Sequence, residues 1–254
     1  MVFDAYSRYY DLLYRDKDYA GEAAYVAAHL RRLSPSATHI LELGCGTGAH
    51  AEPLARVGFR VHGVDRSETM LARAQARKAA LPAETGARLS FGPGDARTVR
   101  TGEHYDAVIS LFHVMSYQAT DADLEAAFAT AAAHLRPEGL FLFDFWYGPA
   151  VLAQRPELRV KRLEDAAIRV TRIAEPALDE AAGTVDVRYD VFVEEKASGR
   201  IAEVRETHRM RYLSLPELAR LRGGAFAERT SVAWMSEREP GPGDWAAMQV
   251  LART

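Results

Sequence analysis

The chain has 254 residues, of which 48% are hydrophobic and 26% are charged, as is ordinary for one α/β domain or one domain with an inserted cap. Its net charge of −3 excludes a global attraction to nucleic acid or to anionic membranes. The single cysteine, Cys45, excludes an intramolecular disulfide. Because the N-terminus also lacks a signal-peptide pattern and no apolar run is long enough to span a membrane, we expect a cytoplasmic protein.

The first half of the chain alternates helix and strand patterns, which predicts a parallel sheet with helices on both faces. We expect helices over 18–33, 49–57, 68–80 and 121–135, and strands over 38–43, 59–64, 87–91, 105–111 and 140–146. Ser67 and Asp121 are the expected caps of the last two helices. The almost wholly apolar run 105–111 is typical of a central strand that is buried on both faces.

The pattern changes after Gly148 and Pro149. From 158 to 213, short alternating runs with glycines at their turns predict an antiparallel insert of three strands after the fifth strand of the sheet. A short helix over 215–221, capped by Ser214, and two strands near 226–235 and 245–251 complete the chain. We therefore expect an α/β core over 36–150 and 214–254, with a β insert over 151–213.

A glycine turn follows the first expected strand. Gly44, Gly46 and Gly48 permit positive φ angles and let a ligand approach the bare backbone, while amides at the next helix favour electron-rich groups. Asp65 ends the following strand, where an acid can accept hydrogen bonds from ribose hydroxyls. The turn fits two patterns, because Ala49 completes a dinucleotide-binding fingerprint and Glu42 completes the acid-x-G-x-G-x-G pattern of methyltransferases.

Later segments distinguish the two patterns. Gly94, Asp95 and Ala96 follow the third strand, where an acid can accept a hydrogen bond from the exocyclic amine of adenine. The segments 105–110 and 134–140 continue the pattern in order. Over residues 38–147 the sequence thus resembles the class I S-adenosylmethionine-dependent methyltransferases.

This resemblance implies a Rossmann-like, seven-stranded sheet with an antiparallel last strand. S-adenosylmethionine would lie across the carboxyl ends of the first strands and leave as S-adenosylhomocysteine. The cofactor-binding residues implied by the resemblance are Tyr14, Glu42, Gly44, Cys45, Gly46, Gly48, Asp65, Arg66, Met70, Gly94, Asp95, Ala96, Leu111 and Phe112. Among them the glycines would face the methionine and sugar, Glu42 the methionine amine, Asp65 the ribose and Asp95 the adenine.

The leader is unusually aromatic, with Tyr6, Tyr9, Tyr10, Tyr14 and Tyr19 in its first twenty residues. Together with the runs 11–13 and 16–19, it resembles the leader of the amino-sugar N,N-dimethyltransferases of antibiotic biosynthesis. The resemblance implies that residues 1–35 form a helical lid that shields the sulfonium from water. Tyr10 or Tyr14 would line the site, since an aromatic face suits a cation.

Two further aromatic stations, 112–117 and 144–148, lie at the expected carboxyl ends of strands, where open α/β sheets bind ligands. His113, Tyr117 and Asp144 are the candidate bases for an amine acceptor, and Tyr10 is a further catalytic candidate. The amino-sugar enzymes carry a histidine near the position of Tyr117, whereas this chain has it earlier, at His113. The insert would roof the acceptor site or form a homodimer contact. The insert residues that could reach the acceptor are Tyr189, Glu194, Glu195, His208 and Tyr212.

The sequence therefore predicts a methyltransferase that acts on a small molecule, with the amine of an amino sugar or sugar nucleotide as the candidate acceptor. Three alternatives remain open: an O- or peptide-methyltransferase, an NAD-dependent oxidoreductase, and a non-catalytic subunit that binds S-adenosylmethionine. We expect no metal, because the histidines and acids lack ligand spacing, and no nucleic-acid or membrane partner.

Overall fold

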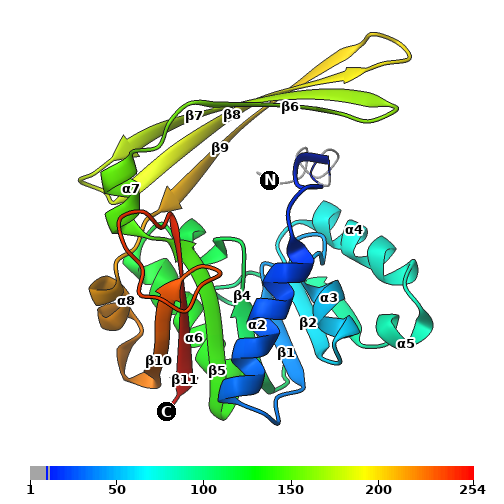
Figure 1. Cartoon of the computed structure of the whole chain (residues 1–254). Coiled ribbons are helices and arrows are strands. Elements are labelled where there is room, and N and C mark those ends of the chain that lie inside the picture. The colour runs from blue at the N-terminus through cyan, green and yellow to red at the C-terminus, as the bar shows by residue number, and fades with distance from the viewer. Residues whose placement is uncertain (1–9, 11) are drawn as a thin grey trace.

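A seven-stranded sheet forms the centre of the computed structural model, which describes residue 10 and residues 12–254 (Figure 1). Its strands are β1 (His39–Leu43), β2 (Arg60–Asp65), β3 (Leu89–Pro93), β4 (Tyr105–Ser110), β5 (Leu135–Trp146), β10 (Phe226–Ala233) and β11 (Ala246–Arg253). They follow the order β10-β11-β5-β4-β1-β2-β3, with β1 to β5 parallel and β11 antiparallel to both of its neighbours. The predicted Rossmann-like sheet with its antiparallel last strand is thereby confirmed.

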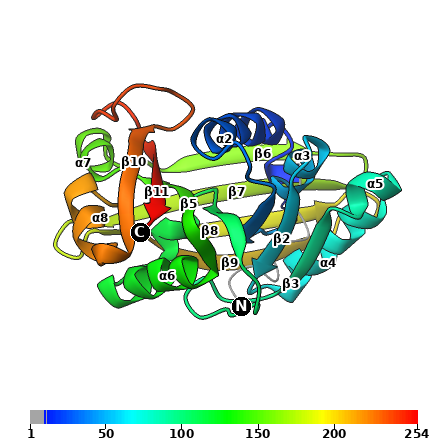
Figure 2. The ribbon, with the colours of Figure 1, turned by 90° about the horizontal axis from the view of Figure 1, so that it is seen from below.

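Helices cover both faces of this sheet (Figure 2). They are α2 (Tyr19–Leu33), α3 (Ala51–Arg56), α4 (Glu68–Ala79), α5 (Ala83–Gly86), α6 (Asp121–His134), α7 (Gly148–Gln154) and α8 (Leu215–Leu221), with the short 3₁₀ helices η1 (Val114–Tyr117) and η2 (Gly223–Ala225). Helices α2 and α3 pack on one face, and α6 and α8 pack on the other. No helix in the described part of the chain is long and apolar enough to cross a membrane.

Every second side chain along β5, from Phe141 to Phe145, contributes to the hydrophobic core. Phe141, Phe143 and Phe145 are fully buried on the α6 side, and the rings of Phe141 and Phe143 lie 5.9 and 5.8 Å from that of Phe128. Burial of one such side chain contributes about 1.5–3 kcal/mol. This packing holds the carboxyl ends of β4 and β5 at a common level.

The elements of the core differ from the prediction mainly at their ends. Thr120, not Asp121, caps α6, because its hydroxyl accepts the amide hydrogen of Asp123. Strand β5 begins at Leu135, directly after α6, because Leu135 already pairs with Tyr105 of β4. Helices α5 and α7 were not predicted, since so few turns carry no recognisable periodicity.

The insert is a four-stranded antiparallel sheet, so the prediction of three strands is wrong by one. Its strands are β6 (Arg159–Glu164), β7 (Ile168–Asp179), β8 (Thr184–Glu195) and β9 (Ile201–Arg211), in that order. The edge strand β6 has charged residues at four of its six positions and thus lacks an alternating apolar pattern. Only its pairing with β7 defines it as a strand.

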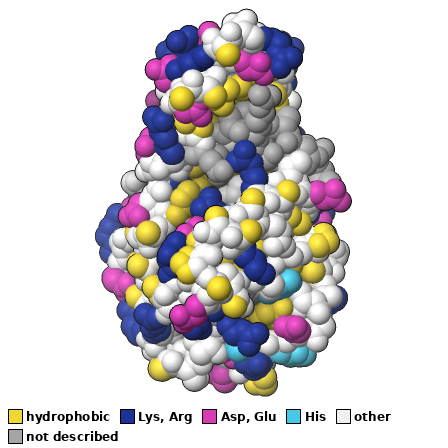
Figure 3. Space-filling model, turned by 90° about the vertical axis from the view of Figure 1, so that its right-hand side faces the viewer, with side chains coloured by type: hydrophobic (Ala, Val, Ile, Leu, Met, Phe, Trp, Pro, Cys, Tyr) yellow, Lys and Arg dark blue, Asp and Glu magenta, His cyan; other side chains and the backbone are white. Residues whose placement is uncertain are grey.

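This four-stranded sheet, called the roof below, lies above the carboxyl ends of the core strands, with residues 12–18 of the leader between them (Figure 1). Leu13 of the leader and Met70 of α4 form one buried apolar cluster with Val170, Val191 and Val193 of the roof. The leader thus joins the roof to the cofactor side of the core. Over the described residues of one face, Figure 3 shows basic, acidic and apolar side chains intermingled rather than grouped by charge.

Glu42 is a buried carboxyl on the otherwise apolar strand β1, where it is 1% exposed. Burial, reinforced by the nearby charge of Asp65, raises the pKa of Glu42 from 4.5 to about 8. Since this folded-state pKa lies above the unfolded one, Glu42 favours folding most below about pH 4.5, and the contribution is lost as the pH rises to about 8.

We therefore expect Glu42→Gln to flatten the decline in stability between these two pH values. Ionising a buried carboxyl over such an interval costs roughly 3–5 kcal/mol, which the neutral amide avoids. Urea unfolding of both proteins at the two ends of the interval measures the difference. The exposed Glu84→Gln is the control, and an equal decline in wild type and Glu42→Gln would contradict the prediction.

Candidate active site

The glycine turn adopts the backbone that its sequence predicted. Gly44, Gly46 and Gly48 have φ angles of 75°, 53° and 72°, which side chains rarely allow. A Cβ at Gly44 would come within 2.6 Å of Val114, and one at Gly48 within 2.8 Å of Phe91. A Cβ at Gly46 would meet no atom within 4 Å. The turn is therefore packed at its ends and open at its centre, where a ligand can approach the backbone.

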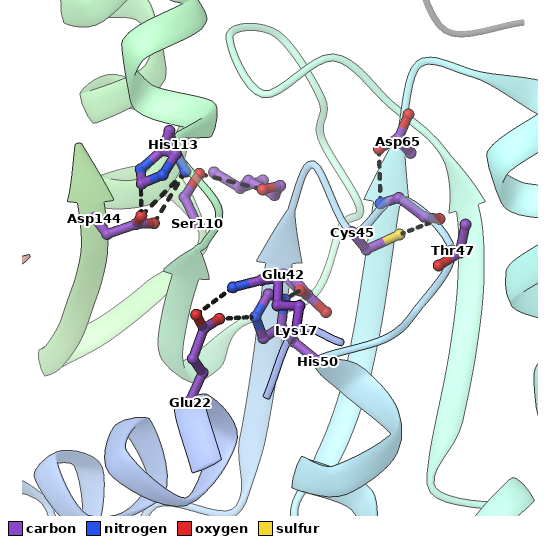
Figure 4. A network of polar contacts seen from close by, with 12 residues as sticks. Lys17, Glu22, Glu42, Cys45, Thr47, His50, Asp65, Ser110, His113 and Asp144 are labelled. Carbon is purple, nitrogen blue, oxygen red and sulfur yellow. Dashed lines mark hydrogen bonds and ion pairs between the residues drawn. The ribbon is translucent and has the colours of Figure 1, made fainter. Parts of the chain in front are cut away.

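Asp65 at the end of β2 holds this turn. Its Oδ2 accepts the amide hydrogen of Gly46 at 2.8 Å, and its Oδ1 accepts that of Ser67, the cap of α4, at 2.9 Å. Burial raises the pKa of Asp65, and the amide hydrogens act in the opposite direction. A carboxylate at the strand end thus lies beside the open centre of the turn, as the sequence predicted (Figure 4).

Asp95, the predicted adenine-binding acid, forms ion pairs with two arginines, Arg97 and Arg66. Arg97 donates from Nε and from one terminal nitrogen to its two oxygens, at 2.9 and 2.7 Å, and the Nε of Arg66 lies 3.4 Å from Oδ2. The hydrogen bonds from Arg97 lower the pKa of Asp95. Ala96 beside it is buried in the core, and Met70 is 3% exposed within the cluster that joins the leader and the roof.

A chain of charged groups connects the leader to Glu42 (Figure 4). Lys17 pairs with Glu22, whose other oxygen lies 2.7 Å from Nε2 of His50. The Nδ1 of His50 lies 4.0 Å from Glu42. Despite its burial, which acts in the opposite direction, the pKa of Glu22 is lowered to about 2 by His50 and Lys17. The ammonium of Lys17 also lies 4.5 Å from the ring centre of Phe112.

His113 and Asp144 form the second polar group at this end of the sheet (Figure 4). Nδ1 of His113 lies 2.6 Å from Oδ2 of Asp144, and the His113 amide also donates to this carboxylate. Phe112 and His113 have φ angles of 63° and 64°, a costly conformation for residues with side chains. The buried carboxylate of Asp144 therefore holds a strained turn, whose histidine side chain is 22% exposed.

Aromatic side chains from the leader and the core meet beside this turn. The ring of Tyr14 packs on Tyr10 at 4.7 Å and edge-on against Phe112 at 5.1 Å. Arg172 of the roof lies over Tyr14 and donates to its hydroxyl at 3.3 Å. The aromatic residues of the leader and of the station 112–117 thus meet at Tyr14 and Phe112, whereas Tyr6 and Tyr9 fall outside the described residues.

The roof adds a polar row above η1. The hydroxyl of Tyr117 lies 2.7 Å from Nδ1 of His208, whose Nε2 lies 3.2 Å from Glu206. The ring of Tyr189 packs edge-on against His208 at 4.9 Å, and Arg172 lies 5.0 Å from the centre of the Tyr189 ring. Tyr117 and His208, 91 residues apart in the chain, thus become neighbours.

The other expected roof residues do not join this row. Glu194 and Glu195 pair with the exposed arginines Arg169 and Arg200. Tyr212 lies in a separate apolar cluster with Val151 and Trp146.

Sequence reasoning missed five polar residues that the fold brings to the site: Lys17, Glu22, His50, Arg172 and Glu206. Lys17 and Glu22 lie at the junction of the leader and α2, where charged residues are common and carry no signal. Glu206 was hidden in a strand with many exposed charges. Its position two residues from His208 places both side chains on one face of β9, which is the one available signal.

Comparisons with known proteins agree with this geometry. Residues 40–139 match the family model described as "Methyltransferase domain". A dTDP-3-amino-3,6-dideoxy-alpha-D-glucopyranose N,N-dimethyltransferase of Streptomyces fradiae is 32% identical over 79% of this chain and 75% of its own length. A dTDP-3-amino-3,4,6-trideoxy-alpha-D-glucopyranose N,N-dimethyltransferase of Streptomyces venezuelae is 38% identical over 57% of this chain, which spans 58% of that relative.

Solved structures are similar over almost the whole chain. An amino pentose methyltransferase from Micromonospora echinaspora, determined with S-adenosylmethionine, has a TM-score of 0.74 and 26% identity over 100% of this chain and 98% of its own. DesVI of Streptomyces venezuelae has a TM-score of 0.80 and 24% identity over 98% of each chain, which establishes a common fold. With its glycine turn, its strand-end aspartate and its sheet order β3-β2-β1-β4-β5-β11-β10, the chain belongs to the class I S-adenosylmethionine-dependent methyltransferases.

Proposed function

We propose that this chain transfers methyl groups from S-adenosylmethionine to the amine of an amino sugar or of its nucleotide derivative. The observation that carries the proposal is the relative from Streptomyces fradiae, an amino-sugar N,N-dimethyltransferase that matches this chain across core and roof. Aromatic and polar groups of the leader, core and roof converge at the carboxyl end of the sheet, as a small polar acceptor requires.

The residues at this end of the sheet suit the methyl donor. The open centre of the turn at Gly46 leaves room for the sugar or methionine part, and Asp65 offers carboxylate oxygens to ribose hydroxyls. One oxygen of Glu42 is buried without a hydrogen-bond partner, so a donor such as the methionine ammonium would satisfy it. The bound donor supplies an activated methyl carbon, so the protein needs to align the acceptor, exclude water and accept a proton.

Tyr10 and Tyr14 belong to the leader that covers this region, and we propose that they line the methyl-transfer site. The packing of Leu13 between core and roof, and the hydrogen bond from Arg172 to Tyr14, support a lid role for the leader. We assign Asp144 a positioning role, since it fixes both the amide and the ring of His113 in the strained turn.

Asp65→Ala should weaken binding of S-adenosylhomocysteine by about 10- to 100-fold. The variant removes the carboxylate acceptor of a ribose hydroxyl, and one such charge-assisted hydrogen bond contributes about 1.5–3 kcal/mol. Calorimetric titration measures the affinity, and the surface variant Asp186→Ala serves as the control. Equal affinities of Asp65→Ala and wild type, or binding of NAD in place of the nucleoside, would refute the proposed donor site.

Wild-type protein should transfer methyl groups to the amine of a dTDP-amino sugar and leave the matching hydroxyl sugar unchanged. A neutral amine is a strong nucleophile, whereas a sugar hydroxyl must first lose a proton to a strong base. Mass spectrometry of the acceptor after incubation with S-adenosylmethionine measures the transfer. Methylation of the hydroxyl sugar alone would favour the O-methyltransferase alternative. No transfer to any amine, hydroxyl or peptide acceptor, with tight donor binding, would favour the non-catalytic subunit.

Asp144→Asn should lower the free energy of unfolding by about 1–3 kcal/mol, because the amide and the half-buried ring of His113 lose a carboxylate acceptor. We expect kcat/KM for the acceptor to fall as well, because the strained turn is then no longer held in place. Urea unfolding and steady-state kinetics measure the two effects, and exposed Glu103→Gln is the control. An unchanged unfolding curve would contradict the assigned role.

Two further expectations from the sequence stay predictions, namely the homodimer and the cytoplasmic location. Sedimentation velocity of the purified chain tests the first, and fractionation of cells that express it tests the second.

A further inference from the structure

A three-residue polar chain, Tyr117–His208–Glu206, joins the roof to the core at η1. Tyr117 comes from η1, directly after β4, and His208 and Glu206 lie on one face of β9. The side chains of His208 and Glu206 are 3% and 7% exposed. Burial of polar side chains is costly unless they are hydrogen-bonded, as these are to one another.

The hydrogen bonds among Tyr117, His208 and Glu206 are all donated in the direction of Glu206. An ionised Glu206 only accepts, so Nε2 of His208 carries the hydrogen that points to it at 3.2 Å. In the neutral imidazole Nδ1 is then a hydrogen-bond acceptor. The hydroxyl of Tyr117, 2.7 Å away, therefore donates to Nδ1. A proton that reaches the oxygen of Tyr117 can thus push the phenolic proton on to His208.

We propose that Tyr117, His208 and Glu206 form a relay that removes the proton of the acceptor amine, an inference that rests on the proposed N-methylation. The acceptor binds as an ammonium, and one of its N–H bonds breaks as the proton passes to the oxygen of Tyr117. The lone pair of the neutral amine then forms the N–C bond as the S–C bond of the donor breaks, and the methylated product carries the positive charge on nitrogen. The Tyr117 hydroxyl proton moves to Nδ1 of His208, and the resulting imidazolium is paired with Glu206. No oxidant or further reactant is needed.

The surroundings favour a relay over a base that acts alone. Burial, with smaller contributions from Tyr189, Tyr14 and Glu206, holds the pKa of Tyr117 well above its usual value. Tyr117 is therefore not a phenolate before the reaction, and it acts best by accepting one proton as it donates another. Of the charged groups near His208, Glu206 stabilises an imidazolium. The positive charge of Arg172 disfavours an imidazolium, but Arg172 is separated from His208 by the ring of Tyr189.

The test variant is His208→Asn. The amide oxygen of asparagine can accept the Tyr117 hydroxyl where Nδ1 stood, but it cannot take a proton. We expect kcat/KM for the amine to fall about 100-fold near neutral pH, the usual contribution of a general base. At a pH above the pKa of the free amine, the acceptor binds already neutral. The difference in kcat/KM between wild type and His208→Asn should then shrink to a few-fold.

Thr207→Val, on the exposed opposite face of β9, is the matched control and should follow the wild-type profile. If His208→Asn fails to fold, Glu206→Gln keeps a hydrogen-bond acceptor while losing the charge that stabilises the imidazolium. It should show the same pH signature in a milder form. A deficit that is equal at every pH, or a His208→Asn profile identical to wild type, would overturn the relay. Absence of amine methylation by the wild type would instead overturn the proposed function.

Discussion

Hydrogen bonds from the amides of Gly44, Cys45 and Gly46 bind the glycine turn to β2, and the rest of the site is arranged around them. The amide of Gly44 donates to the carbonyl of Val64, and the amide of Gly46 donates to Asp65, both at 2.8 Å. Gly44 and Gly46 have positive φ angles, which side chains disfavour, and a side chain at Gly44 would also meet Val114, so glycine suits this path. The bare backbone is consequently exposed at Gly46 beside a carboxylate, and this pair of features selects an adenosine-bearing ligand over a purely apolar one.

Burial of charge is concentrated at this end of the sheet. Glu42 and Asp65 both have raised pKa values because they are withdrawn from water, and Asp144 lies fully buried beneath His113. Carboxyls in such positions weaken the fold, and they persist where a ligand or a reaction uses them. Here each lies at or beside the end of a parallel strand, where helices and loops leave the backbone accessible.

The roof and the described part of the leader pack against the core at the end of the sheet where the glycine turn lies. Leu13 and Met70 join the roof to the core through one apolar cluster, and Arg172 reaches from the roof to Tyr14. Burial strengthens the hydrogen bonds between such polar groups. The same packing brings His208 of the roof to Tyr117 of the core.

The sequence by itself determined the order of the core elements, the glycine turn and Asp65, because these depend on local periodicity and on backbone angles that only glycine adopts. It did not reveal β6, whose charged residues become a strand only through pairing with β7. It also could not join Lys17 to Glu42 through Glu22 and His50, or Tyr117 to His208, because no local pattern encodes contacts between distant segments. Those pairs were decided by the tertiary structure, in which the packing of leader, core and roof brings the segments together.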